Sequence, residues 1–308
     1  SESIILTPFT INKMRCDVRY LIALGFLVIL AVNFSASAVF TQTNYASKIE
    51  AWRVEQEERL TADTGYLTMV ALYFLREGNN SFGTSPLNDL VLSEGPDEVG
   101  TFALRDGKVS VQAVAGQTLT IDGETVTQAF LYPRENRATI AIGNLTMWVH
   151  YSGPRLAIRV SDKNSPIRRT FTGLRWFPVD EAYRVRARFV PHDPITAKFA
   201  NILGDLETYP SSGTVTFMLN GQEITMRPVD RGERLWFIFR DLTSGSETYP
   251  AARFLYADAP ENGWTTLDFN QAYSPPCAFN PYTTCPLPQP ENRLRIRIEA
   301  GEMYEHST

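Results

Sequence analysis

The chain has 308 residues, about twice the ~150-residue prior for one domain, so one large domain or two small ones would fit. Its 44% hydrophobic and 20% charged residues are typical of a globular protein and exclude wholesale disorder. The net charge of −5 argues against a nucleic-acid partner, because phosphate binding requires clustered positive charge. Three cysteines exclude a disulfide-rich scaffold, and three histidines argue against an all-histidine metal site.

Residues 1–38 have the pattern of a secretory signal peptide preceded by a short extension. A start at Met14 places two arginines before the apolar run 21–32. As a helix this run would cover ~18 Å, short of the ~30 Å hydrocarbon core of a bilayer. Residues 36–38 are Ala-Ser-Ala, small residues that suit a cleavage site. We therefore expect a secreted or periplasmic protein, mature from about Val39 and with no membrane span after cleavage. An uncleaved N-terminal anchor is the alternative.

The next two segments differ in how clearly they indicate their structure. A polar helix is expected over residues 45–63, where Ile49, Trp52 and Leu60 form a narrow apolar stripe. Residues 66–77 are nearly continuously apolar, a pattern that fits either a buried helix or a strand.

From about residue 100 onward the pattern is that of a β-protein. Asp106-Gly107, Asp122-Gly123 and Asn220-Gly221 each separate two strand-like runs, as type I′ hairpin turns do. Further strands are expected at residues 138–142, 145–151, 156–160, 184–190, 235–239, 253–257 and 294–298. These short strands predict a mainly β protein, either a β-sandwich or two packed β-sandwich-like lobes, with a short N-terminal helical segment.

A polar, turn-rich stretch at residues 161–166 is the expected boundary between two lobes. Residues 39–161 would then form an N-terminal helix and a forkhead-associated-like β lobe. Residues 162–308 would form a C-terminal β lobe that contains the proline-rich loop 274–290. The alternative is an ordinary loop inside one large β domain.

Residues 78–111 distantly resemble a forkhead-associated module, with a turn glycine, the segment 88–92 (NDLVL) and a hairpin. In that family an arginine after the turn glycine and a Ser/His pair bind phosphothreonine. Here Thr84 follows Gly83 and no histidine follows. The resemblance therefore implies a β-sandwich and not phosphopeptide binding.

Several catalytic and cofactor motifs are absent from the sequence: G-x-S-x-G, HExxH, the P-loop, G-x-G-x-x-G and the EF-hand loop. His150 and His192 are the histidines that a catalytic triad could use. His150 stands in a strand-like run, which favours a structural histidine, and His192 stands in a proline-bounded turn, which favours a solvated loop. The sequence thus indicates no cofactor.

The proline-rich loop 274–290 holds six of the 19 prolines together with Cys277 and Cys285. Such a segment is neither a helix nor a central strand, and long loops of this kind are usually functional or firmly packed. In an oxidising compartment a disulfide between the two cysteines is the favoured interpretation. Two structural free thiols, and a metal site completed by Asp268 or Glu291, are the alternatives.

A group of charged and polar residues stands among apolar neighbours in the C-terminal part. Its candidate catalytic carboxylates are Asp241, Asp268 and Glu291. Its candidate binding residues are Arg240, Arg253, Asn270, Tyr273 and Asn292. One interpretation is a buried salt-bridge and hydrogen-bond network that clamps the proline-rich loop. The other is a polar pocket in which Asp241/Asp268 or Asp268/Glu291 act as general acid and base.

Four segments carry a close resemblance to a known family: LDFN at 267–270, PPCAF at 275–279, CPLP at 285–288 and ENRL at 291–294. They resemble the uncharacterised bacterial and archaeal proteins of domain of unknown function 1684, from the Trp52 helix to Glu302. The resemblance implies no activity. Residues 250–252 (PAA) depart from it, because relatives tend to have glycines there.

The function expected from these observations is that of an exported β module of the cell envelope, either structural or binding a small molecule or an envelope component. The alternative is a hydrolase-like enzyme with a carboxylate-based site in the C-terminal lobe. An enzyme should direct at least two of the carboxylates into an open pocket, whereas a clamp should bury and pair them.

Overall fold

The computed structural model describes residues 44–304, and the chain divides into two compact units, residues 1–48 and 49–308. Of the first unit only residues 44–48 are described, and they are helical. The signal-peptide prediction for residues 1–38 lies outside the described residues. Within the described range no helix is long and apolar enough to cross a membrane.

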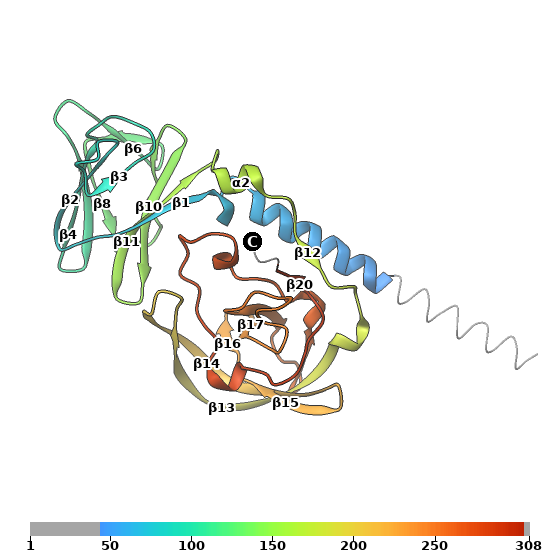
Figure 1. Ribbon diagram of the computed structural model, residues 1–308. Coiled ribbons are helices and arrows are strands. Elements are labelled where there is room, and N and C mark those ends of the chain that lie inside the picture. The colour runs from blue at the N-terminus through green and yellow to red at the C-terminus, as the bar shows by residue number, and fades with distance from the viewer. Residues whose placement is uncertain (1–43, 305–308) are drawn as a thin grey trace, which may run out of the picture. The chain divides into compact units, whose positions relative to one another are not determined.

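The second unit begins with helical residues 49–61 and continues as antiparallel β structure (Figure 1). The ambiguous segment 66–77 divides into the 3-10 turn η1 (Tyr66–Thr68) and the strand β1 (Met69–Phe74). The N-terminal strands that follow are β2 (Gly78–Gly83), β3 (Leu90–Val91), β4 (Gly100–Arg105), β5 (Lys108–Ala113), β6 (Leu119–Ile121), β7 (Glu124–Val126), β8 (Gln128–Tyr132), β9 (Ile140–Ile142), β10 (Leu145–Ser152) and β11 (Arg155–Asp162).

These strands form a β-sandwich of two sheets, ordered β1-β11-β10-β9-β6-β7 and β3-β2-β4-β5-β8. Both sheets contribute to one hydrophobic core, for example Phe82 and Phe102 from the second and Met147 and Ile158 from the first. The resemblance of this lobe to a forkhead-associated module stays a prediction.

The C-terminal elements come after residue 165. They are α2 (Pro166–Thr170), β12 (Arg175–Trp176), η2 (Glu181–Tyr183), β13 (Arg184–Ala200), β14 (Leu206–Leu219), β15 (Gln222–Met226), β16 (Val229–Arg231), β17 (Arg234–Phe239), β18 (Arg253–Asp258), β19 (Trp264–Asp268), η3 (Phe269–Gln271), η4 (Pro276–Ala278), η5 (Pro290–Asn292) and β20 (Glu302–Met303). The strands form sheets ordered β15-β14-β13-β19, β16-β17-β18 and β12-β20. The mainly β fold predicted from the sequence is confirmed, and the boundary at residues 161–166 stays a prediction.

The three hairpin turns are confirmed in position and geometry. Asp106, Asp122 and Asn220 have φ of 50°, 52° and 52°, and the glycine that follows each also has a positive φ. Type I′ turns require this backbone at both central positions, which Asp, Asn and Gly tolerate best.

The run LWFIF in β17 is buried on both faces of its sheet. Trp236 lies opposite Tyr256, and Ile238 lies opposite Phe254, so these four side chains share one face. Leu235 and its alternate neighbours face the larger C-terminal core on the other side. A continuous apolar strand therefore separates a core from the face that lines the pocket described below.

Residues 294–298 form no strand, although the predicted alternation of burial is present. Leu294, Ile296 and Ile298 are buried and the residues between them are exposed. The backbone groups of this segment bond to irregular backbone and to side chains instead of to a neighbouring strand: the N–H of Leu242 donates to the carbonyl of Ile296 at 2.8 Å. The strand expected here is therefore wrong: the alternating pattern predicted which side chains are buried, but residues 295–296 form a bend and the segment has no neighbouring strand.

Arg253 and Asp241 hold this segment from inside the protein. The Arg253 guanidinium, 1% exposed, donates from Nη1 to the Ile298 carbonyl at 3.0 Å and from Nη2 to the Ala300 carbonyl. Asp241 Oδ2 accepts from the Ile298 N–H at 2.6 Å, and its Oδ1 lies 3.5 Å from Arg253 Nη1. One buried ion pair therefore replaces the missing strand ladder.

We predict that Arg253→Met destabilises the protein by about 3–5 kcal/mol, because it leaves the buried Asp241 carboxylate without its cation. Chemical denaturation followed by circular dichroism would measure the loss. Arg134→Met is the matched control, since Arg134 pairs with Asp122 on the surface at 3.2 Å and should cost no more than about 1 kcal/mol. Equal losses in the two variants would show that the clamp does not carry the stability assigned to it.

Candidate functional site

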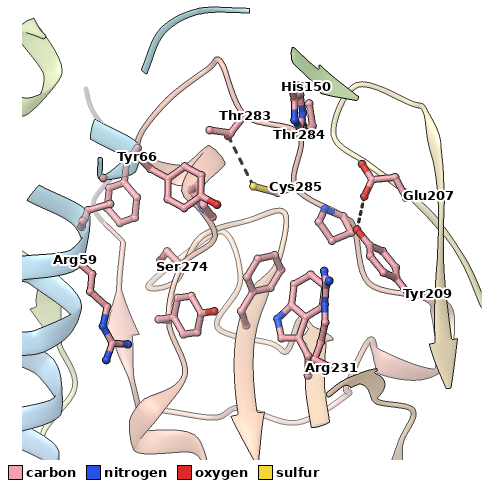
Figure 2. A pocket seen from close by; sticks show the side chains of 18 of the residues that line it. Arg59, Tyr66, His150, Glu207, Tyr209, Arg231, Ser274, Thr283, Thr284 and Cys285 are labelled. Atoms are coloured by element: carbon pink, nitrogen blue, oxygen red, sulfur yellow. Dashed lines mark hydrogen bonds between the residues drawn. The ribbon is translucent and has the colours of Figure 1, made fainter. Parts of the chain in front are cut away.

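A cavity of about 1030 Å³ lies among β10, β11, β14, the β16-β17-β18 sheet and the proline-rich loop (Figure 2). Its walls contain eight aromatic side chains: Tyr66, Tyr151, Tyr209, Trp236, Phe254, Tyr256, Tyr273 and Phe279. Its polar and charged side chains include Arg59, His150, Arg159, Glu207, Arg231, Ser274, Thr283, Thr284, Cys285 and Glu302. The size and the combination of aromatic and polar side chains are those of a small-molecule site.

Trp236 is the centre of the aromatic wall. Its ring stacks with Tyr256 at a centroid distance of 6.1 Å and meets the edges or faces of Phe254 and Tyr209 at 4.9 and 5.7 Å. The Arg231 guanidinium lies 4.8 Å from the Trp236 ring centroid and 5.0 Å from that of Tyr209. Trp236 Nε1 is buried and has no hydrogen-bond partner among the described residues.

Glu302 is a buried carboxyl group on the same cavity. Its Oε2 accepts from the Ser274 N–H at 2.9 Å, while its Oε1 has no hydrogen-bond partner in the part of the chain that the structure describes. Burial raises the pKa of Glu302 from 4.5 to about 7, and the Ser274 hydrogen bonds and the Arg253 charge oppose that rise. Near neutral pH this group can therefore accept or donate a proton.

Gly301 brings the backbone of Glu302 close to the start of the proline-rich loop. It has a φ of +83°, and a Cβ there would lie 2.4 Å from the Ala272 carbonyl oxygen. The Glu302 N–H donates to that same carbonyl at 2.8 Å. Only glycine permits this approach, which sets the Glu302 side chain beside Ser274.

His150 and Arg159 form a second polar corner of the cavity. His150 Nε2 lies 2.9 Å from both Thr284 Oγ1 and Arg159 Nη2, so it accepts hydrogen bonds and the ring is neutral. Burial, with the charges of Arg159 and Arg137, lowers the pKa of His150 to about 3. His150 therefore carries no proton for acid catalysis at neutral pH, in agreement with its interpretation as a structural histidine.

Cys277 and Cys285 are free thiols, so the disulfide expected from an oxidising compartment is not formed in the structure. Instead, the Cys277 N–H donates to Cys285 Sγ at 3.2 Å. The Cys277 thiol also donates to Cys285, which lowers the pKa of Cys285 and raises that of Cys277. Within the described residues no group of three or more His, Cys, Asp or Glu side chains is placed to hold a metal ion.

The three predicted carboxylates do not line the cavity. Asp241 is buried in its pair with Arg253, and Asp268 accepts from the Asn270 N–H at 3.2 Å and from its side-chain amide at 3.1 Å. Glu291 pairs with Arg227 at 2.7 Å. The carboxylates proposed as general acid and base thus each bind a different partner. The carboxylate-based hydrolase stays a prediction.

The predicted binding residues lie partly at the cavity and partly away from it. Tyr273 lines the cavity, where burial raises the pKa of its hydroxyl. Asn270 bonds through its side chain to the backbone of Asp180, and Asn292 donates to the carbonyls of Arg227 and Ile238. The backbone of Arg240 bonds to that of Asn292 and Leu294. Their contacts match a clamp, while their role as ligand-binding residues stays a prediction.

Sequence reasoning missed Glu302, and a usable signal for it was present. Residues 294, 296, 298 and 300 are the buried positions of the alternating segment, and Glu302 continues that phase. A carboxyl at the buried phase of such a pattern indicates a special environment. No such signal exists in the sequence for Trp236, since the apolar run 235–239 is typical of an ordinary core strand.

Comparisons with known proteins give a family but no activity. Residues 169–303 match the profile of the family described as "Protein of unknown function (DUF1684)". A solution NMR structure of an uncharacterized protein from Haloarcula marismortui is 32% identical; the match covers 46% of this chain and 81% of that one, with a TM-score of 0.40. No curated protein matches the chain.

We predict that Glu302→Gln changes how stability depends on pH. The raised pKa favours the protonated carboxyl in the folded state, so the wild type keeps the full stability below pH 4.5 and loses it as pH rises through about 7. The variant lacks this loss, and its stability relative to wild type should therefore rise by about 3 kcal/mol between pH 4 and pH 8. Urea denaturation at each pH would measure the difference.

Glu299→Gln is the control for this series, because Glu299 is an exposed partner of Arg297 at 2.8 Å. A Glu302→Gln difference as flat with pH as that of Glu299→Gln would contradict the assignment.

Proposed function

Since the chain belongs to the DUF1684 family, whose description states no activity, we propose from the cavity itself that the protein binds a small organic molecule with a flat ring body. The observation that carries this proposal is the aromatic wall around Trp236 together with two of the four buried polar atoms of the lining that have no protein partner among the described residues, Trp236 Nε1 and Glu302 Oε1.

The aromatic wall supplies the affinity in this proposal. Ring faces and edges at right angles to one another, as at Trp236 and Tyr209, offer both stacking and edge contacts to a flat ligand. The Arg231 guanidinium is exposed beside these rings and can attract an electronegative substituent. Drug-sized ligands usually lie in cavities of this size.

The two unpartnered atoms supply the orientation. A buried polar atom without a partner costs roughly 1–3 kcal/mol, so a ligand that pairs with it recovers that cost on binding. Trp236 Nε1 can only donate, whereas the Glu302 carboxyl can accept or donate near neutral pH because of its raised pKa. The ligand that fits therefore carries an acceptor near Trp236 and a hydrogen-bonding group near Glu302.

We propose further that this binding takes place outside the cytoplasm, as a secreted or periplasmic module of the cell envelope. The support is the signal-peptide pattern of residues 1–38. N-terminal sequencing of the protein isolated from its native cells should find a chain that begins near Val39. Recovery of the uncleaved chain from the membrane fraction would contradict it.

We predict that 8-anilinonaphthalene-1-sulfonate, a fluorescent aromatic sulfonate, binds the folded protein and that Trp236→Ala weakens this binding roughly tenfold or more. Removal of the indole takes away the ring that Tyr209, Phe254 and Tyr256 surround. Fluorescence titration measures the dissociation constant, and circular dichroism checks the fold.

Trp264→Ala is the matched control, because Trp264 lies on β19 under Arg186, outside the cavity lining, and is 38% exposed. Equal affinities in the two variants would reject the cavity as the binding site. Trp236→Phe, which keeps a ring but lacks the N–H, serves if the alanine variant does not fold.

A further inference from the structure

The two cysteines of the proline-rich loop form a thiol pair that is held in place before any reaction. The Tyr249 hydroxyl donates to the Cys277 carbonyl at 3.0 Å, and the Ile202 N–H donates to the Cys285 carbonyl at 2.9 Å. Between them, the Asn280 side chain donates to the Met69 carbonyl at 2.7 Å. These contacts fix both ends of the loop that carries the thiols.

The two thiols differ in access. Cys285 is buried within the protein but contributes to the wall of the cavity, whereas Cys277 is partly exposed and is not part of the lining. Figure 2 shows Cys285 beside Thr283, whose hydroxyl oxygen is 3.8 Å from Cys285 Sγ. A molecule in the cavity therefore meets Cys285 first.

The surroundings of Cys285 favour its thiolate. The hydrogen bonds from Cys277, the contact with the Thr283 hydroxyl and the positive charge of Arg159 lower the pKa of Cys285, and burial opposes them. Arg159 is only 7% exposed; burial lowers its pKa, and the charges of Cys285 and Glu207 are among those that oppose this shift. Its Nη2 contacts neutral His150, and its Nε has no partner among the described residues, so the thiolate is an anion that this buried cation can compensate.

We propose that Cys285 and Cys277 form a thiol–disulfide exchange site for small organic disulfides that enter the cavity, with Cys285 as the attacking thiolate and Cys277 as the resolving thiol. The site is independent of the ring-binding proposal. A structural disulfide stays oxidised. This cysteine pair, in contrast, must be oxidised to a disulfide and reduced again to two thiols.

The exchange balances in two steps. The Cys285 thiolate attacks one sulfur of the substrate R–S–S–R′, which forms a Cys285–S–S–R bond and releases R′S⁻. The Cys277 sulfur then attacks the Cys285 sulfur, its proton passes to the departing RS⁻, and a Cys277–Cys285 disulfide forms. The organic disulfide is the oxidant and leaves as two thiols after it has taken up two electrons.

The test uses the full chain with Cys16→Ser in every protein, reduced and then exposed to 5,5′-dithiobis(2-nitrobenzoate). The parent protein should release two thionitrobenzoate molecules per chain and end with an internal disulfide, seen by mass spectrometry as the loss of two hydrogens. Cys277→Ser should release one and retain a stable adduct on Cys285. Cys285→Ser should react at least tenfold more slowly, since burial raises the pKa of the remaining Cys277 thiol and leaves little thiolate near neutral pH.

Arg159→Met tests the positioning of the thiolate. The pH profile of adduct formation in Cys277→Ser should move to higher pH, with a rate near neutral pH roughly tenfold lower. Reduction of the internal disulfide by glutathione should restore the reactive pair.

Three results would overturn the proposal: a stable mixed disulfide on the parent protein, equal rates for the two cysteine variants, or an internal disulfide that glutathione does not reduce. If Cys285→Ser fails to fold, peptide mapping of the adduct on Cys277→Ser and the parent's stoichiometry decide the same question.

Discussion

The buried ion pair between Arg253 and Asp241 is the constraint on which the C-terminal part of this protein depends. Residues 294–300 alternate between buried and exposed side chains, yet they have no strand ladder to hold them. The Arg253 guanidinium binds two of their carbonyls, and the Asp241 carboxylate binds the Ile298 N–H between those carbonyls. Burying these two charges is costly unless each is paired and hydrogen-bonded, and here both bind the backbone and lie beside each other, with only Arg253 Nε lacking a partner among the described residues.

This clamp also determines where the cavity chemistry lies. The clamped segment leads through Gly301 to Glu302, whose carboxyl bonds to the Ser274 N–H at the start of the proline-rich loop. Asp241 and Arg253, which the sequence suggested as catalytic and binding residues, therefore have a structural role and keep Glu302 in place. The raised pKa of this carboxyl results from its burial at a position that the backbone imposes.

The cavity wall has an aromatic part and a polar part. One wall is the aromatic face of the β17–β18 pair, centred on Trp236, and the opposite edge contains Cys285, beside Thr283 and Thr284, and the Arg159–His150 corner. The hydrogen bond between Thr284 Oγ1 and His150 Nε2 and the one from Asn280 to the Met69 carbonyl link the proline-rich loop to the N-terminal part of the same compact unit. A loop that prolines exclude from regular structure is thus fixed by side chains and becomes a wall of the site.

The sequence by itself determined the mainly β fold, the hairpin turns, the alternating burial of residues 294–298 and the family, because each depends on local pattern: alternation, turn residues and contiguous motifs. The tertiary structure decided which polar residues face the cavity. Burial and pairing depend on contacts between segments far apart in the chain, such as Arg253 with Ala300 and His150 with Thr284. Local sequence pattern does not specify those contacts. The sequence alone therefore indicated the polar residues of this region but not which of them belong to the clamp and which line the cavity.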